Sequence, residues 1–309
     1  MKNFINLKDI PTKDLRKILI DAKKRKKLRR KLSILEVDKS YPLKGKLLIQ
    51  MFEKSSLRTR LSFYLAIKQL GGSTLTLRPD ELHFSKGGES IEDTAKILSN
   101  FGNAFMLRTN NDKKLEEFSR YLSIPIINGL SPSSHPTQIL SDVFTVEEIK
   151  KKSISKLNIT WIGDSNNVLN SLIAASIKFS FKLKIGCPSK FKPSKKILEY
   201  MKKNRNKILM HNDPKEAVIG SDVIFSDKVI SMNDKVNKVQ KLKHFKKFKI
   251  DKQLMSYAKK DCIFLHCLPR GAEVDEKVFS SKQSKVWQQA LNRVHVQKSI
   301  LLYCLGKLR

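Results

Sequence analysis

The sequence predicts an α/β protein of two domains, each a parallel sheet flanked by helices. The chain has 309 residues, more than one hydrophobic core usually supports, since domains commonly hold about 100–200 residues. Short apolar runs alternate with segments of helical period almost from end to end, as in βαβ units. The alternation restarts after the Lys-rich residues 150–156, so we expect a domain boundary near residue 150.

The first half of the chain contains four strand candidates. They are residues 46–52, 73–77, 104–108 and 125–128. Apolar residues at helical spacing fill the intervals between them. Leu61, Tyr64 and Leu65, for example, share one face of a helix that the pair Gly71 and Gly72 ends.

The second half repeats this rhythm with five strand candidates. They are residues 157–163, 183–187, 208–211, 222–226 and 262–266. A last helix extends from about residue 282 to the C-terminus, and its pattern alone fits either domain. Sheets of this class bind ligands outside the carboxyl ends of their strands, so functional residues are expected directly after the strand candidates.

The charge balance is strongly basic, with 62 Lys and Arg residues against 29 Asp and Glu residues and a formal net charge of +33. The basic residues are scattered in runs such as 23–27, 150–152 and 241–249. We interpret them as a solvated surface that attracts small anionic substrates by electrostatic steering. A nucleic-acid-binding surface is the alternative, and our first interpretation predicts no nucleic-acid partner.

The cysteines and the N-terminal residues bear on cofactors and location. Cys187, Cys262, Cys267 and Cys304 form no C-x-x-C pair and have no His at zinc-finger spacing, which predicts neither a metal site nor a disulfide scaffold. Residues 1–12 hold no apolar stretch long enough for a signal peptide or a membrane span. We therefore expect a cytoplasmic protein with no metal, no organic cofactor and no membrane partner.

The strand candidate 46–52 leads directly into a polar segment at the start of a helix. Residues 53–60 place hydroxyls, guanidinium groups and free backbone N–H groups at one helix N-terminus, where anions bind. Arg58 and Arg60 are two residues apart on a helix and cannot face the same way, so we expect Arg58 to bind the anion and Arg60 to brace the loop. Simple helix capping is the alternative. Neither a Walker A loop nor a dinucleotide-binding glycine pattern is present in the sequence.

A second polar motif, His-Pro-Thr-Gln at residues 135–138, follows the strand candidate 125–128. Pro136 suits the first turn of a helix, which the pattern extends to residue 149. His135 at the helix start and Gln138 one turn later can hydrogen-bond a carbonyl oxygen or an NH₂ group. A structural histidine near a helix cap is the alternative.

Three further polar motifs follow strands in the second half. Residues 163–167, Gly-Asp-Ser-Asn-Asn, place Asn side chains at a strand-to-helix turn, where they can recognise a carboxylate or a carboxamide. Asp227 begins a polar loop that continues to Ser231 and Met232. Residues 264–270 end a buried strand in His-Cys-Leu-Pro-Arg, which places Cys267 to touch a substrate. Turn chemistry, an exposed loop and an inert buried thiol are the respective alternatives.

Together, and in this order over nearly the whole chain, these motifs resemble those of the aspartate/ornithine carbamoyltransferase family. The family's Ser-Thr-Arg-Thr-Arg loop corresponds to residues 56–60, its His-Pro-Thr-Gln motif is intact at residues 135–138, and its strand-ending Arg corresponds to Arg108. The resemblance is to the ornithine branch rather than the aspartate branch at three places. These are Asn166 with Asn167, Asp227 with Ser231 and Met232, and Cys267.

The chain departs from the family's pattern at two positions. Leu57 replaces a Thr, which removes a hydroxyl but keeps the backbone N–H group that such a loop uses. Asn233 follows Met232 where the family usually has Gly, and Asn tolerates left-handed backbone better than most residues. His83 stands near a family position that carries Gln or His.

The resemblance implies transfer of a carbamoyl group from carbamoyl phosphate to the side-chain amine of ornithine, giving citrulline and phosphate, in an arginine-biosynthesis or urea-cycle-type step. It implies a homotrimer, or a multiple of trimers, with active sites between subunits. It assigns residues 1–150, with the C-terminal helix at about 285–309 packing back on them, to a carbamoyl-phosphate-binding domain, and residues 151–284 to an ornithine-binding domain.

The resemblance also implies a set of site residues. The catalytic residues are Arg108, His135 and Cys267. The carbamoyl-phosphate-binding residues are Ser56, Leu57, Arg58, Thr59, His83, Arg108, His135, Gln138, Cys267, Leu268 and Arg293. The ornithine-binding residues are Asn167, Asp227, Ser231 and Met232.

Two alternatives remain open at this point. One is a sister carbamoyltransferase that acts on another amine, such as putrescine or an acylated ornithine, and a panel of amine substrates separates it from the ornithine enzyme. The other is a nucleic-acid-binding protein on an α/β scaffold. It predicts tight, salt-sensitive binding to DNA or RNA of mixed sequence, and it leaves the ordered polar motifs unexplained.

Overall fold

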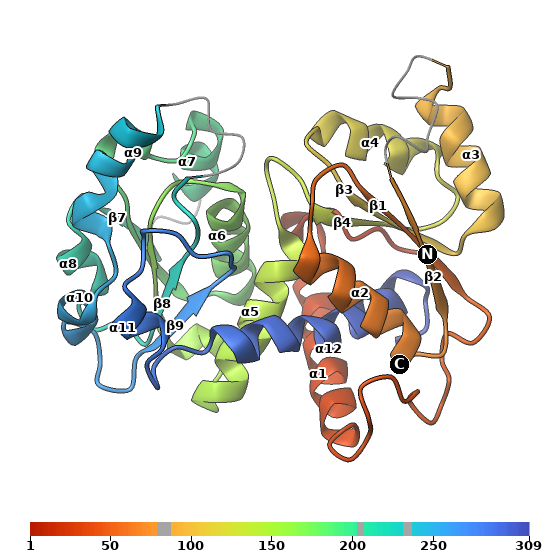
Figure 1. Ribbon diagram of the computed structural model, residues 1–309, viewed down its shortest axis with the longest axis horizontal. Helices are drawn as coiled ribbons and strands as arrows, with labels where there is room; N and C mark the ends of the chain where they lie inside the picture. The colour runs from red at the N-terminus through yellow and green to blue at the C-terminus, as the bar shows by residue number, and fades with distance from the viewer. Residues whose placement is uncertain (79–87, 203–206, 231–236, 309) are drawn as a thin grey trace. The chain divides into compact units, whose positions relative to one another are not determined.

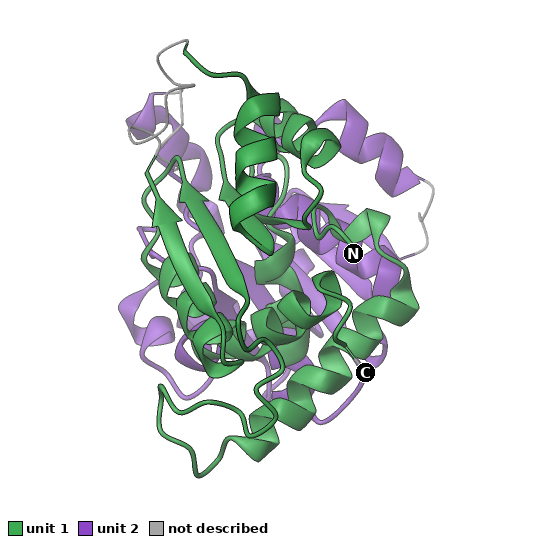
Figure 2. Cartoon of the chain, turned by 90° about the vertical axis from the view of Figure 1, so that its right-hand side faces the viewer, with its two compact units in different colours: residues 1–144, 291–309 green, residues 145–290 purple. Residues whose placement is uncertain are grey.

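The computed structural model describes residues 1–78, 88–202, 207–230 and 237–308, and its chain divides into two compact units (Figure 1). Unit 1 contains residues 1–144 and 291–309, and unit 2 contains residues 145–290 (Figure 2). Each unit is built on its own parallel sheet with helices around it. The predicted fold class is therefore confirmed.

Unit 1 holds a four-stranded parallel sheet in the order β2-β1-β3-β4. The strands are β1 (Leu47–Phe52), β2 (Ser73–Leu77), β3 (Ala104–Arg108) and β4 (Ile126–Leu130). The central strand β1 pairs with both neighbours, so that Leu48 lies opposite Thr74 on one side and Ala104 on the other. All four strands fall on the predicted segments, although β4 extends beyond residue 128 because Arg108 pairs with Leu130 after a shift in register.

The helices of unit 1 cover both faces of its sheet. They are η1 (Leu7–Asp9), α1 (Thr12–Leu28), α2 (Leu57–Gln69), α3 (Ile91–Phe101), α4 (Asp112–Tyr121), the first part of α5 (Pro136–Lys150) and most of α12 (Val286–Cys304). Figure 1 shows α3 and α4 on one side of the sheet and α1, α2 and α12 on the other. On the α3–α4 side, Leu98 and Phe118 pack against the strand residues Ile49, Phe105 and Leu107.

The C-terminal helix packs on unit 1 through buried polar contacts. From α12, Lys298 bonds Asp38 at 2.8 Å and the Tyr303 hydroxyl donates to Asp14 at 3.2 Å. The helix begins at Val286, later than the predicted residue 282. The reason is that the preceding backbone lies along β9, with Phe264 N–H donating to the Gln283 carbonyl at 2.9 Å and Lys285 N–H donating to the Phe264 carbonyl at 2.9 Å.

Unit 2 holds a five-stranded parallel sheet in the order β7-β6-β5-β8-β9. Its strands are β5 (Asn158–Ile162), β6 (Lys182–Gly186), β7 (Ile208–His211), β8 (Val223–Ser226) and β9 (Ile263–His266). Its helices are η4 (Ile154–Lys156), α6 (Asn167–Phe179), η5 (Ser189–Phe191), α7 (Lys195–Lys202), α8 (Pro214–Val218), α9 (Lys238–Phe245), η6 (Lys246–Phe248), α10 (Lys252–Ser256) and α11 (Glu276–Phe279). All five strands fall on the predicted segments.

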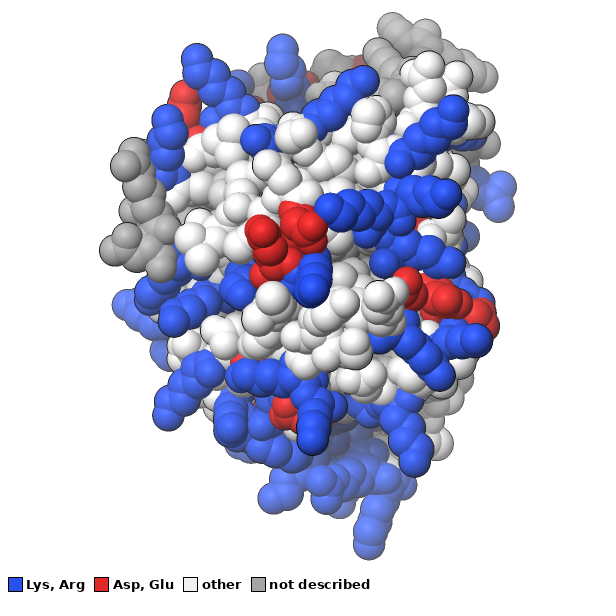
Figure 3. Space-filling view, turned by 90° about the vertical axis from the view of Figure 1, so that its left-hand side faces the viewer, with Lys and Arg blue, Asp and Glu red and all other residues white. Residues whose placement is uncertain are grey.

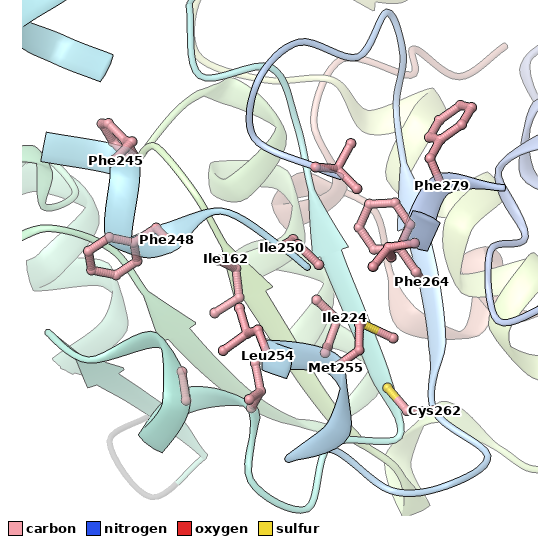
Figure 4. Close-up of a cluster of buried hydrophobic side chains, with 14 of the residues drawn as sticks. Ile162, Ile224, Phe245, Phe248, Ile250, Leu254, Met255, Cys262, Phe264 and Phe279 are labelled. Carbon is pink, nitrogen blue, oxygen red and sulfur yellow. The ribbon is translucent and has the colours of Figure 1, made fainter. Parts of the chain in front are cut away.

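One face of the unit 2 sheet packs on a cluster of aromatic and aliphatic side chains (Figure 4). The strands β5, β8 and β9 contribute Ile162, Ile224 and Phe264. The helical segments that follow β8 and β9 contribute Phe245, Phe248, Leu254, Met255 and Phe279. Burying a Phe or Leu side chain contributes about 1.5–3 kcal/mol, so this cluster fixes the strands whose ends carry the polar motifs.

The order of strands reverses once in each sheet. In unit 1 the reversal lies between β1 and β3, and in unit 2 it lies between β5 and β8. In open α/β sheets the crevice at such a switch point, outside the carboxyl ends of the strands, is where ligands bind. The loops after these four strands contain residues 53–56, 109–111, 163–166 and 227–230. In the described part of the chain, no helix is long and apolar enough to cross a membrane.

Candidate active site

In unit 1 the loops after β1 and β3 are fastened together by Glu53. Its N–H group donates to the Arg108 carbonyl at 2.9 Å. Its carboxylate accepts from the Thr109 hydroxyl at 2.5 Å and from Asn110 N–H at 3.2 Å, and it forms an ion pair with Lys114. Burial opposes ionisation of Glu53, but the hydrogen bonds from Lys114 and Thr109 outweigh it and hold the pKa of this carboxyl below its ordinary value. The switch point of unit 1 is therefore held by a fixed carboxylate.

The helix α2 begins beside this loop with an unused cap. Ser56 has the extended backbone of an N-cap residue, yet its side chain makes no capping hydrogen bond. A Ser at this position normally accepts from a backbone N–H group of the first turn. Simple capping therefore does not account for the hydroxyl, and the first-turn N–H groups at residues 57–59 keep the geometry of an anion site. Leu57, the departure from the family's Thr, is 70% exposed.

Five positively charged or basic side chains of unit 1 influence one another electrostatically. Burial and the charge of Arg58 lower the pKa of Arg108 to about 10. Burial and the charges of Arg293, Arg108 and Arg58 hold the pKa of His135 well below its ordinary value. Burial and the charge of Arg108 also lower the pKa of Lys54. Positive charges lower one another's pKa in this way only when they lie close together. Arg58, Arg108, His135, Arg293 and Lys54 therefore form a cluster that favours binding of an anion.

Contacts within unit 1 fix several members of this cluster. Arg293 from α12 donates through Nη2 to the Thr59 hydroxyl of α2 at 2.8 Å, although the two residues are 234 positions apart. His135 is buried and directly precedes α5. Arg60 points elsewhere, with its guanidinium 5.6 Å from the centre of the Phe52 ring. The two arginines of α2 thus diverge, as their helical spacing predicted.

In unit 2 the loops after β5 and β8 meet through Asn166 and Asp227. The Asn166 Oδ1 atom caps α6 by accepting from the N–H groups of Val168 and Leu169 at 3.0 and 3.1 Å. Its Nδ2 atom donates to Asp227 Oδ2 at 2.9 Å. Burial raises the pKa of the Asp227 carboxyl above its ordinary value, against the opposing effects of His266 and of this hydrogen bond. Asn166 makes this contact, although only its neighbour Asn167 was predicted as a site residue.

The loop after β9 is organised by the ring of His266. Leu268 N–H donates to His266 Nδ1 at 2.9 Å, which makes Nε2 the protonated nitrogen, and Nε2 lies 3.1 Å from Glu273 Oε1. Leu268 has a φ of 59°, a left-handed conformation that Leu rarely adopts. Glu273 also accepts from Val229 N–H at 3.4 Å. One carboxylate therefore contacts both the loop after β9, which carries Cys267, and the loop after β8.

The structure brings together five of the predicted site residues in unit 1. In unit 1 Arg58, Thr59, Arg108, His135 and Arg293 are linked by hydrogen bonds or by their mutual effects on pKa. The predicted site residues His83, Ser231 and Met232 lie outside the described part of the chain. Asn233, one of the departures from the family's pattern, also lies outside it.

Sequence reasoning missed two side chains that the structure places at the switch points. Lys54 was considered only as part of a polar loop, although its position between a strand and a helix N-terminus already put a charge beside Arg58. Asn166 was named as part of a motif but not as a site residue, although an Asn directly before a helix is the expected N-cap. Across the described residues, no cluster of His, Cys, Asp and Glu is suited to hold a metal ion.

These features define a class of protein: a two-domain α/β protein with a cation-rich anion site at the switch point of one sheet and a carboxylate–amide pair at the switch point of the other. Models of two family domains match this chain. The carbamoyl-P binding domain of aspartate/ornithine carbamoyltransferases matches residues 2–148, and the Asp/Orn binding domain matches residues 155–304. The chain belongs to the aspartate/ornithine carbamoyltransferase family, as its motifs predicted, and is an enzyme of carbamoyl transfer.

Individual relatives cover the whole chain. The ornithine carbamoyltransferase of Rhizorhabdus wittichii is 40% identical over 309 residues, which is 99% of both chains. The solved ornithine carbamoyltransferase of Pyrococcus furiosus is 36% identical, with a TM-score of 0.91 over 99% of this chain and 97% of that one. The solved anabolic ornithine carbamoyltransferase of Campylobacter jejuni is 37% identical, with a TM-score of 0.89 over the full length of both.

Proposed function

We propose that the protein transfers the carbamoyl group of carbamoyl phosphate to the side-chain amine of L-ornithine, giving L-citrulline and phosphate. The observation that carries the proposal is the cluster of Arg58, Arg108, His135 and Arg293 at the switch point of unit 1, where each group favours an anion. The relatives named above support ornithine as the amine. We assign carbamoyl phosphate to residues 1–150 with 285–309, and ornithine to residues 151–284.

The phosphate of carbamoyl phosphate binds at the N-terminus of α2. Ser56, Arg58 and Thr59 and the backbone N–H of Leu57 supply hydrogen bonds, while Arg108 and Arg293 add charge. Because three of these groups are guanidiniums in one cluster, a dianion relieves their mutual repulsion when it binds. The leaving group is thus stabilised before its bond breaks. We assign His83 to the same substrate, through a neighbouring subunit of a homotrimer.

The carbamoyl carbon is activated by donors to its oxygen. Arg108, His135 and Thr59 donate to this oxygen, whose negative charge grows as the amine attacks. A low pKa keeps His135 neutral, so its ring acts as a hydrogen-bond donor without adding a further charge to the cluster. Losing one such donor typically lowers the rate by about 10²–10³. Gln138 and the Leu268 carbonyl hold the carbamoyl NH₂ group.

Ornithine is assigned to the switch point of unit 2. Asn167, Asp227, Ser231 and Met232 bind it, and Cys267 lies beside the reacting amine. That amine has a lysine-like reference pKa of roughly 10.4 and must lose a proton to attack. The departing phosphate accepts this proton, so no protein base is required. We place the reaction in the cytoplasm, in keeping with four cysteines that form no disulfide.

Citrulline formation by the purified protein tests the proposal, with ornithine compared with putrescine and acylated ornithines. Two variants separate the substrates. Arg58→Ala should weaken carbamoyl phosphate binding and lower turnover by about 10²-fold or more, because a charged donor to the phosphate is lost. Asp227→Asn should raise the KM for ornithine far more than that for carbamoyl phosphate.

The controls follow from the same assignment. Arg60→Ala serves as the matched control for Arg58→Ala, since Arg60 lies against Phe52 on the same helix, and it should keep most of the activity. Normal activity of Arg58→Ala would refute the phosphate assignment. Equal losses for both substrates in Asp227→Asn would refute the assignment of ornithine to unit 2.

A further inference from the structure

The helix α5 contains a buried carboxylate that the proposed mechanism does not use. Asp142 is fully buried and lies one helical turn after Gln138, which is 2% exposed. The side-chain NH₂ group of Gln138 donates to Asp142 Oδ1 at 2.8 Å. This is the only hydrogen bond that the Gln138 side chain makes within the described parts of the chain. One carboxylate oxygen of Asp142 therefore holds the Gln138 amide in its orientation.

The chemistry of the pair gives that orientation a direction. An ionised carboxylate only accepts hydrogen bonds, whereas a glutamine amide presents a donor on one side and an acceptor on the other. An amide with no fixed neighbour can turn over and exchange the two. Because the NH₂ group of Gln138 faces Asp142, the Gln138 carbonyl oxygen faces away from it. The side chain consequently offers its oxygen as an acceptor to a ligand, while Asp142 occupies one of its two N–H donors.

We propose that Asp142 is a positioning residue that fixes the Gln138 amide with its oxygen toward the substrate and thereby selects a carbamoyl group over an acetyl group. The inference rests on the proposed function, in which Gln138 holds the carbamoyl NH₂ group. That NH₂ group is a donor and satisfies the oxygen. The methyl group of acetyl phosphate has the same shape but donates nothing, so the buried oxygen is left unpaired.

The helix supports this role by keeping the two residues in register. Residues four apart on a helix lie on one face, one above the other. Pro136, the first residue of α5, favours a helix start that places Gln138 in the first turn beside His135. Ser141, next to Asp142, donates its hydroxyl to the Thr137 carbonyl at 2.7 Å. Among the residues that the structure describes, Asp142 alone supplies an acceptor to the Gln138 side chain.

The test replaces Asp142 with Asn, which keeps the shape but can donate as well as accept. The Gln138 amide is then free to turn over. We expect kcat/KM for carbamoyl phosphate to fall about three- to tenfold, while the Ki of acetyl phosphate as a competitive inhibitor changes less than about twofold or decreases. Discrimination is measured as kcat/KM for carbamoyl phosphate divided by 1/Ki for acetyl phosphate, and this ratio falls by about three- to tenfold. Inhibition by inorganic phosphate, which contains neither group, stays unchanged.

Two further variants define the interpretation. Ser141→Ala lies on the same helix, and it should leave the ratio as in the unaltered enzyme. Gln138→Met removes the acceptor and should lower the ratio at least as much as Asp142→Asn. The double variant should be no worse than Gln138→Met alone, because Asp142 acts only through Gln138. A purely structural role for Asp142 would instead lower binding of all three ligands together.

The outcomes separate this inference from the proposed function. If the unaltered protein makes no citrulline, the proposed function fails. If it makes citrulline and Asp142→Asn keeps the full ratio of carbamoyl phosphate to acetyl phosphate, the inference alone is overturned. Asp142→Ser, which also removes the fixed acceptor and admits a water molecule, replaces Asp142→Asn if that variant does not fold. An unchanged ratio in Gln138→Met overturns the inference as well.

Discussion

His135 is a buried imidazole surrounded by positive charge. Burial and the neighbouring Arg293, Arg108 and Arg58 all oppose a proton on this ring, so its pKa lies well below the ordinary value of about 6.5. An unfolded chain has no such environment and binds the proton near the ordinary value. The folded state therefore binds fewer protons than the unfolded state at mildly acidic pH. Stability must fall as the pH drops through this range.

We predict that His135 stays neutral in the folded protein well below pH 6.5. Nuclear magnetic resonance of ¹⁵N-histidine should show one imidazole whose shifts do not change between about pH 8 and pH 6, and His135→Gln should remove that signal. Below about pH 6.5 the unaltered protein should lose up to about 1.4 kcal/mol of unfolding free energy per pH unit more than His135→Gln.

His135→Gln is the control for the unaltered protein, because it lacks the His135 imidazole and retains every other titrating group. Equal pH slopes for the unaltered protein and His135→Gln, or an imidazole signal from His135 that titrates near pH 6.5, would contradict the prediction. A bound phosphate dianion brings an opposite charge to the ring and should raise its pKa, which gives a second measurement on the same signal.

Secondary-structure elements were largely readable from the sequence, because strands buried on both faces appear as continuous apolar runs. Residues 104–108 and 208–211 were predicted to the residue as β3 and β7. The start of α12 was not, since residues 283–285 leave the helix to bond Phe264. Helical periodicity describes a segment's own face and carries no information about such a distant strand.

The site shows the same division between local and distant information. Polar residues after strands and at helix starts were identifiable, because the carboxyl ends of parallel strands lie at one edge. The hydrogen bond between Arg293 and Thr59 joins segments 234 residues apart, and the sequence suggested it only through resemblance to a family. Turn composition alone does not decide which of the adjacent Asn166 and Asn167 becomes the N-cap of α6, and in the structure it is Asn166.

The attachment of α12 to unit 1 depends on a buried ion pair. Lys298 is inaccessible to solvent, and its Nζ atom lies 2.7 and 2.8 Å from the two carboxylate oxygens of Asp38, which Arg29 also bonds at 2.9 Å. Burial lowers the pKa of Lys298 to about 8 despite this partner. Arg293 lies five residues before Lys298 on α12, so its position depends on the same attachment.

We predict that Lys298→Met destabilises the protein by about 1.5–3 kcal/mol, because the buried Asp38 loses a charge-assisted hydrogen bond and keeps only its pairs with Arg29 and Arg25. Chemical denaturation measures the loss. Asp38→Leu should also be costly, and the two changes together should cost less than their sum. Lys96→Met is the matched control: Lys96 pairs with Glu92 on an exposed helix face and its loss should have little effect. Strictly additive losses at Lys298 and Asp38 would contradict the prediction.

The charge of the whole molecule remains unexplained by its site, since +33 far exceeds what one dianion requires. Figure 3 shows a face on which Lys and Arg side chains are spread over most of the surface, with few acidic groups between them. Such a distribution produces a broad positive potential instead of a single basic patch. A potential of this kind raises the local concentration of small anions, and salt screens it over a Debye length of about 10 Å at 0.1 M.

We predict that kcat/KM for carbamoyl phosphate falls severalfold between about 20 mM and about 200 mM salt, while kcat changes little, because screening weakens capture of the dianion and not the chemical step. Initial rates at saturating ornithine measure this effect. Ornithine is the internal control, since its net charge is positive and screening should not reduce its kcat/KM in the same way.

Competition by the salt's anion at the Arg58 cluster would mimic the loss, so chloride and acetate are compared at equal ionic strength. Screening depends on ionic strength alone and requires the two curves to coincide; curves that diverge would assign the loss to anion binding at the site and leave the surface charge without a kinetic role.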